Sequence, residues 1–319
     1  MQPPSPPPIQ RMPPVADAAL PALPALTPAQ PTHRMPTQWR MAFCMAGAYV
    51  LFWWVGALFS IPADRGFSGS LLKQPIVGAL LSLLVGGVLL VLTTFVVELI
   101  ASSYWYFAGP LAASAGLCAW SFRGGSSVYT LASVHPTTAG PSVFYLLAAE
   151  CVILGAGFAL VWFLLHRFFH LPKVKDQPAF SLIPTPEVLR IILTQVVLTA
   201  IGVLLLVPTS DKKQALFGVL IASTLASGAV RYFHPNRLPE YWCWAAPLLV
   251  GIIGYLLNSF DSSHLAVETG QVTGMFAPLA RPLPLDYAGA GVLGALIGLG
   301  MTSDDWSRTG KVTLAVAKP

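Results

Sequence analysis

Tyr104-Trp105-Tyr106-Phe107-Ala108-Gly109-Pro110-Leu111 recurs in this chain as Tyr241-Trp242-Cys243-Trp244-Ala245-Ala246-Pro247-Leu248. The shared Tyr, Trp and Pro are scarce in an apolar sequence, so composition alone does not explain the match. Flanking similarities keep the same order, because Lys73-Gln74 followed by Gly78 resembles Lys213-Gln214 followed by Gly218. Collinear similarity of this kind predicts a duplicated structural unit.

The composition is that of a membrane protein. Hydrophobic residues make up 55% of the chain and charged residues 10%, whereas a soluble domain carries about 25% charged residues. A helix needs about 20 apolar residues to cross a bilayer core. The sequence predicts an all-α polytopic membrane protein with eight spans, at 41–61, 75–99, 104–121, 143–165, 188–207, 214–231, 241–259 and 286–303.

The positive charges predict the orientation of these spans. With both termini in the cytoplasm, twelve Lys and Arg lie on the inner side and six on the outer side, as the positive-inside rule requires. We therefore expect a multi-pass protein of the cell (inner) membrane. This bias accounts for the net charge of +5, so no nucleic-acid partner is expected.

The chain divides by composition into five parts. Residues 1–40 contain twelve prolines and no apolar run, which predicts a disordered Pro-rich cytoplasmic tail. The first four-helix repeat follows at 41–170, a cytoplasmic linker at 171–187, the second repeat at 188–303 and a C-terminal tail at 304–319. Because four crossings return the chain to its starting side, we expect the repeats to be parallel.

The repeated motif has a predicted structural role within each half. Tyr104, Trp105, Tyr241 and Trp242 are expected in the aromatic belt at the membrane interface. Pro110 and Pro247 would then lie inside the third span of each half and kink it.

Small residues recur at four-residue spacing in three spans, a pattern that lets helix backbones approach closely in lipid. The residues are Gly78, Ser82 and Gly86, then Ser223 and Ser227, then Ala290, Gly294 and Gly298. The eighth span, which holds the last three, is expected to be buried. Such faces also offer contacts to a membrane-protein partner or a second copy, besides the lipid bilayer itself.

Two polar side chains inside spans are candidates for transport or for buried hydrogen bonding. Glu150 lies about 10 Å below the outer end of the fourth span at 1.5 Å per residue. An acid at that depth is costly unless it faces protein or water, and it marks an ion path or a structural hydrogen bond. Gln195 in the fifth span is expected to bond between helices.

Glu98, His166, His170 and His234 form a weaker cluster expected near the inner face. His166 and His170 are four residues apart, but the His-Glu-x-x-His pattern of zinc enzymes is absent. We predict no metal site, no cofactor and no catalytic residue.

Three functional interpretations remain open. The first is a non-catalytic scaffold or accessory subunit, which needs little buried charge. The second is a small-solute or ion transporter that uses the repeat interface and Glu150. The third is an intramembrane enzyme that uses Glu98 with the inner histidines. The sequence lacks nucleophile, phosphate-binding and paired-carboxylate motifs, which favours the two interpretations without enzyme activity.

Overall fold

The computed structural model describes residues 37–59, 76–101, 107–124, 141–169, 183–209, 211–234, 240–260, 267–268, 271–272 and 277–301. The chain divides into two units, Met1–Met35 and Pro36–Pro319. All of the described residues belong to the second unit.

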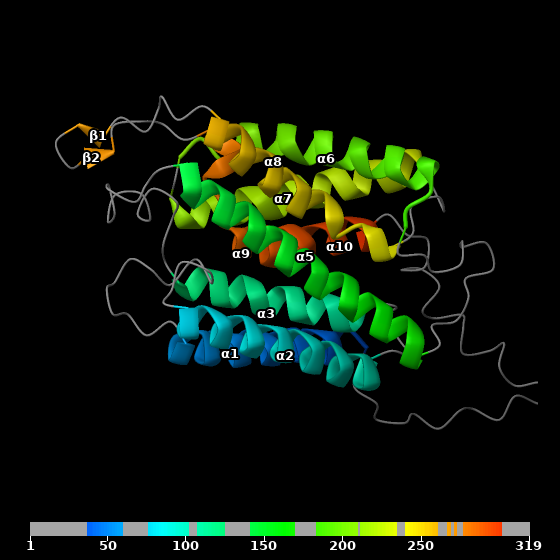
Figure 1. The fold of residues 1–319 in the computed structure, drawn as a ribbon. Coiled ribbons are helices and arrows are strands. Elements are labelled where there is room, and N and C mark those ends of the chain that lie inside the picture. Colours follow the sequence, from blue (N-terminus) through cyan, green and yellow to red (C-terminus); the bar gives the residue numbers. More distant parts are fainter. Residues whose placement is uncertain are drawn as a thin grey trace, which may run out of the picture. The chain divides into compact units, whose positions relative to one another are not determined.

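The described residues are almost entirely helical (Figure 1). The main helices are α1 (Thr37–Phe59), α2 (Ile76–Ala101), α3 (Ala108–Gly124), α5 (Pro141–Phe169), α6 (Pro186–Leu206), α7 (Lys212–Phe233) and α8 (Ala245–Phe260). The last segment joins α9 (Pro284–Asp286), the π-helical turn η4 (Tyr287–Gly291) and α10 (Val292–Met301). Short 3-10 turns lie at η1 (Glu240–Trp242) and η3 (Pro278–Ala280), and β1 (Val267–Glu268) pairs antiparallel with β2 (Gln271–Val272).

Six helical segments among the described residues are long and apolar enough to cross a membrane. They are α1, α2, α5, α6, α7 and the continuous α9–η4–α10 segment. Helices α3 and α8 are shorter, with 17 and 16 residues. The length and composition of these helices thus support the predicted class, an all-helical multi-pass membrane protein.

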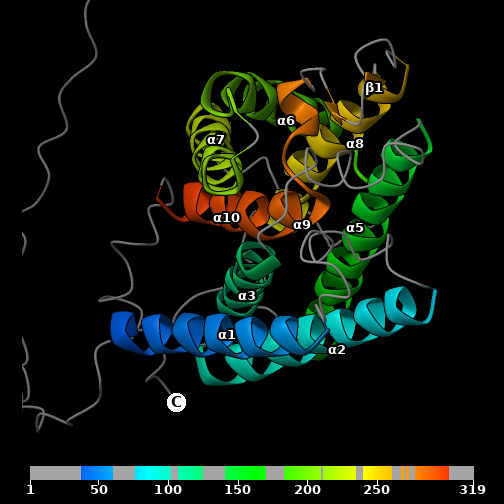
Figure 2. The same cartoon turned by 90° about the vertical axis from the view of Figure 1, so that its left-hand side faces the viewer.

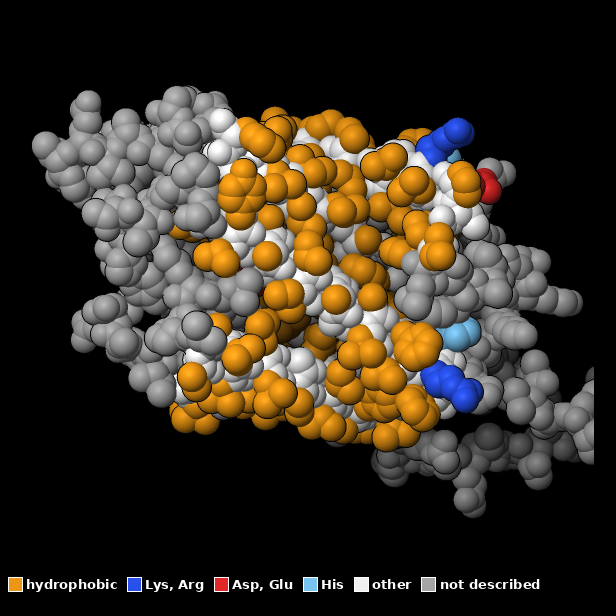
Figure 3. Space-filling model, viewed as in Figure 1, with side chains coloured by type: hydrophobic (Ala, Val, Ile, Leu, Met, Phe, Trp, Pro, Cys, Tyr) orange, Lys and Arg blue, Asp and Glu red, His pale blue; other side chains and the backbone are white. Residues whose placement is uncertain are grey.

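The surface of the helices is apolar, as lipid contact requires. Hydrophobic side chains cover the face seen in Figure 3, and the coloured charged side chains gather at one end of it. Helices α1 and α2 are the least buried of the six candidate spans, and Trp54 and Leu84 are among their exposed side chains.

Helices α9 and α10 form the buried centre of the unit. Figures 1 and 2 show this segment between α3 on one side and α7 on the other. A Cβ atom at Gly294 would lie 2.2 Å from the Leu220 carbonyl oxygen of α7, and one at Gly289 would lie 2.5 Å from the Cys118 amide nitrogen of α3. The small residues therefore let three backbones meet. The predicted burial of the eighth span is confirmed, because 89% of it is buried.

Helices α3 and α5 each pack on a helical segment from later in the chain. Helix α5 packs along α8, and α9, η4 and α10 pack against α3 (Figure 2). Helix α1 packs mainly on α3, whereas α6 packs mainly on α7. Aromatic rings fill these contacts: Phe52 of α1 meets Trp120 of α3, and Phe158 of α5 stacks on Trp244 just before α8.

The predicted kinks at Pro110 and Pro247 are wrong. Helix α3 begins at Ala108 and α8 at Ala245, after the aromatic residues rather than with them. Each proline is therefore the third residue of its helix, where its missing N–H has no helical acceptor to lose. The two prolines occupy equivalent places, at the start of a helix.

Candidate functional site

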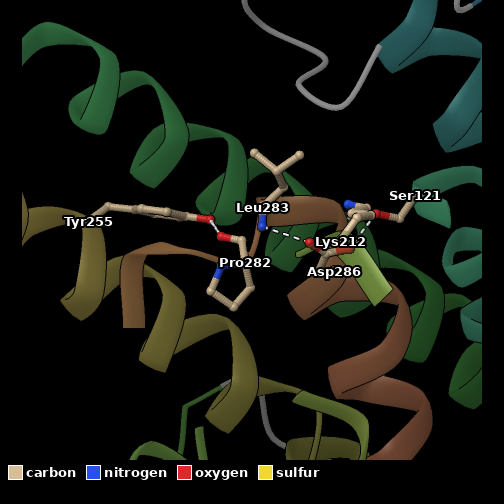
Figure 4. Close-up of polar contacts among 6 residues, drawn as sticks. All are labelled: Ser121, Lys212, Tyr255, Pro282, Leu283 and Asp286. Atoms are coloured by element: carbon tan, nitrogen blue, oxygen red, sulfur yellow. Dashed lines mark hydrogen bonds and ion pairs between the residues drawn. The ribbon is translucent and has the colours of Figure 1, made fainter. Parts of the chain in front are cut away.

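The most polar buried site joins three helices through one ion pair. Lys212 Nζ, at the start of α7, lies 2.6 Å from Asp286 Oδ1, at the end of α9. Lys212 Nζ also donates to Ser121 Oγ of α3 at 2.9 Å, and Ser121 Oγ donates to the same Asp286 oxygen at 2.6 Å. Figure 4 shows these three side chains converging. We refer to Ser121, Lys212 and Asp286 as the polar tie.

Lys212 lies in the first turn of α7, and Asp286, the last residue of the short α9, lies in the first turn of the continuous α9–η4–α10 segment. Asp211 is the N-cap of α7, and its Oδ2 accepts from the Gln214 amide. Lys212 follows at the first helical position, where a cation is unfavourable near the positive end of the helix dipole unless an anion balances it. Asp286 supplies that anion. Its other oxygen, Oδ2, accepts the Leu283 amide of its own helix start at 2.8 Å.

The segment that leads into α9 is fixed by further buried bonds. Tyr255 of α8 donates its hydroxyl to the Pro282 carbonyl (Figure 4), and Tyr287 donates to the Leu279 carbonyl at 2.7 Å. Arg281 Nη1 donates to the Val207 carbonyl at 2.8 Å, at the C-terminal end of α6, where a cation complements the helix dipole. Burial lowers the pKa of the Arg281 guanidinium below its ordinary value.

Glu150 lies inside the protein at the contact between α5 and α8. Its side chain is 0% exposed. The next residue, Cys151, packs against Gly251 of α8 together with Tyr287. Glu150 therefore lies beside the residue that packs where α5 meets α8.

Gln195 bonds between helices as its residue type suggested. Its Nε2 donates to Ser227 Oγ of α7 at 2.7 Å and to the Cys243 carbonyl at 3.2 Å, just before α8. The side chain is fully buried, and it connects α6, α7 and the approach to α8.

The structure does not bring the inner-face candidates together within the described residues. Glu98 is buried in α2 and its Oε2 accepts the Gly109 amide at 3.0 Å, at the start of α3. His166 is exposed on α5 and His234 is partly exposed after α7. His170 lies outside the described residues. No group of three His, Cys, Asp or Glu side chains suited to a metal occurs in the part of the chain described.

The structure describes the second copy of the repeated motif in full and the first copy from Phe107 onward. Tyr104 and Trp105 lie outside the described residues. Tyr241 and Trp242 belong to η1, and the Trp242 ring stacks on Trp244 with 5.9 Å between centroids.

Sequence reasoning missed the polar tie. The positive-inside count assigns Lys212 and Arg281 to the outer loops, but both are buried in the protein. One signal was available: Asp286 opens the eighth expected span and Lys212 precedes the sixth, so both charges adjoin apolar runs. The ion pair joins residues 74 positions apart on two helices, α7 and α9, which no local pattern reveals.

No protein-family model, curated protein or solved structure matches this chain. The site must therefore be interpreted from its own geometry.

Proposed function

We propose that the chain crosses the cell (inner) membrane eight times, α3 and α8 included, with both termini in the cytoplasm. We further propose that the crossings form two parallel four-helix repeats. The equivalent positions of Pro110 and Pro247 support this, as does the reciprocal packing of α5 on α8 and of α9–η4–α10 on α3. A rotation that exchanges the halves would exchange these two contacts.

Within this architecture we propose a non-catalytic role, as a membrane scaffold or accessory subunit. The observation that carries the proposal is the bonding of the polar tie. Lys212 donates to Ser121 and Asp286, and Asp286 also accepts from Ser121 and the Leu283 amide. These groups form hydrogen bonds with one another across α3, α7 and α9, as expected of charges that hold helices together in lipid.

A small-solute or ion transporter is the second candidate. It is favoured by Glu150, a fully buried acid at the contact of α5 with α8. Ionisable residues inside membrane spans mark solute or proton paths by default, and transporter sites lie where repeats meet. An intramembrane enzyme has less support, because Glu98 is bonded to the backbone of α3 and His166 is exposed on α5.

Flux through reconstituted vesicles separates the two proposals. Purified protein would be placed in vesicles that contain a pH-sensitive dye, and proton uptake would be followed after an external pH jump. A scaffold should give the rate of protein-free vesicles, for the wild type and for Glu150→Gln alike. When a scaffold is extracted from native membranes with detergent, it should also co-purify with another membrane protein in a fixed ratio.

The matched control is Glu98→Gln, which changes a second fully buried acid that lies on α2. Uptake above the protein-free rate that Glu150→Gln abolishes and Glu98→Gln retains would overturn the scaffold proposal and support the transporter.

A further inference from the structure

Four buried polar side chains lie on α6 and α7, about half-way along both helices. They are Gln195 and Thr199 of α6 and Ser223 and Ser227 of α7, and all four are 0% exposed. None of them carries a charge at neutral pH. Both helices are candidate membrane spans, so water cannot reach these groups from the lipid side.

The orientation of the Gln195 amide is fixed by its neighbours. The Cys243 carbonyl can only accept a hydrogen bond, so the amide nitrogen must face it. The same nitrogen donates to Ser227 Oγ. The amide oxygen Oε1 is therefore turned away from both groups, and it has no hydrogen-bond partner among the described residues.

Two hydroxyls lie one helical turn from this amide. Helices α6 and α7 run antiparallel, because Gln195 bonds to Ser227 while Gly202 packs on Ala222. Thr199 lies one turn after Gln195 on α6, and Ser223 lies one turn before Ser227 on α7. Because the helices are antiparallel, both residues are displaced from the Gln195–Ser227 bond in the same direction along the helix axes. Thr199 Oγ1 and Ser223 Oγ are also buried and have no hydrogen-bond partner in the described part of the chain.

We propose that an ordered water molecule binds here, bridging Gln195 Oε1, Thr199 Oγ1 and Ser223 Oγ. Buried waters in proteins make about three hydrogen bonds to polar groups that otherwise lack partners. Water can donate to the amide oxygen and both donate to and accept from hydroxyls, which matches this set. A cation fits less well, since the four side chains offer it no carboxylate to offset its desolvation.

The sign of a stability change tests the proposal. If water joins these groups, Thr199→Val and Ser223→Ala each break a hydrogen bond and should lower the Tm by a few degrees. The double variant should lose less than the sum, because both changes act on one water. If the site is dry, each change removes an unpaired buried hydroxyl, and the Tm should rise or stay constant. That result would overturn the proposal.

Thr94→Val is the matched control. Thr94 is also a fully buried threonine in a candidate span, but its hydroxyl donates to the Leu90 carbonyl of its own helix. Its effect on Tm measures the loss of one ordinary intrahelical bond, against which the Thr199→Val shift is compared.

A density map of the wild type, at a resolution where ordered water is visible, provides the direct observation. A peak within hydrogen-bonding distance of Gln195 Oε1 and both hydroxyls is the expected result. An empty site between well-ordered side chains would contradict it. A peak that appears only in sodium, with shorter distances and more oxygen neighbours, would also contradict it.

Discussion

Lys212 Nζ lies 2.6 Å from Asp286 Oδ1, and this contact ties the start of α7 to the end of α9. Both side chains are nearly inaccessible, at 9% and 1% exposure. Neither charge would be tolerated alone in this environment, because an unpaired buried charge is costly. The pair therefore constrains how the last helical segment sits against α7 and, through Ser121, against α3.

Removing the hydroxyl of Ser121 should destabilise the protein. Ser121→Ala takes one acceptor from Lys212 and one donor from Asp286, and a loss of about 1–3 kcal/mol is expected. Thermal unfolding in detergent measures it. Ser114→Ala is the control, since Ser114 is equally buried in α3 but, among the described residues, its hydroxyl donates to the Pro110 carbonyl of its own helix. Equal effects of the two variants would contradict the bridging role.

Adding a methyl group at the α7–α10 contact should separate the two helices. A Cβ atom at Gly294 or Gly298 would lie 2.2 Å from a carbonyl oxygen of α7, so Gly294→Ala and Gly298→Ala should each cost about 1–3 kcal/mol. The measurement is the yield of monodisperse protein together with its Tm. Gly87→Ala, where no described atom outside its own helix lies within 4 Å of the added atom, should be neutral or slightly stabilising. A similar response at all three positions would refute the close packing.

Glu98 should be replaceable by glutamine but not by leucine. Glutamine keeps an oxygen that can accept the Gly109 amide, whereas Glu98→Leu leaves that buried amide without its acceptor, at a cost of about 1–3 kcal/mol. Comparison of the two Tm values checks this. If Glu98→Gln is as destabilising as Glu98→Leu, the carboxylate charge matters more than the bond to α3.

The eight-span topology predicts that Ser126 and Ser262 face the outside. Single cysteines introduced at these positions, in a chain whose four native cysteines are replaced, should react with an impermeant thiol reagent added to intact cells. Cysteine at Arg308 should react only after the membrane is opened. Labelling of Ser126→Cys or Ser262→Cys only in opened cells would show that the crossings are miscounted.

Hydropathy predicts the helices well because a backbone surrounded by lipid has few stable conformations other than a helix. A backbone in hydrocarbon must bond within its own segment, so apolar runs such as the one that becomes α5 are helical wherever they lie. The ends are harder to predict. The third and seventh expected spans begin at the aromatic residues, but α3 and α8 begin four residues later, because proline favours the first turn of a helix over its interior.

The candidate site was predicted only in part. Glu150 and Gln195 could be singled out because a polar residue inside an apolar run is conspicuous. The partners of Gln195 could not, since Ser227 and Cys243 come from other helices. The polar tie depends on contacts between α3, α7 and α9, and its charges border the apolar runs, where the positive-inside rule assigns them to loops.

A double-mutant cycle on Lys212 and Asp286 tests the central claim that buried charge holds the helices together. The free energy of unfolding would be measured for Lys212→Met, Asp286→Asn and the double variant. Each single change leaves the other charge buried without its counter-ion, and should cost about 3 kcal/mol or more. The double variant should be more stable than the sum of the two losses predicts, by at least about 1 kcal/mol. Losses that simply add would mean that the two residues do not interact, and would contradict the structural role proposed for them.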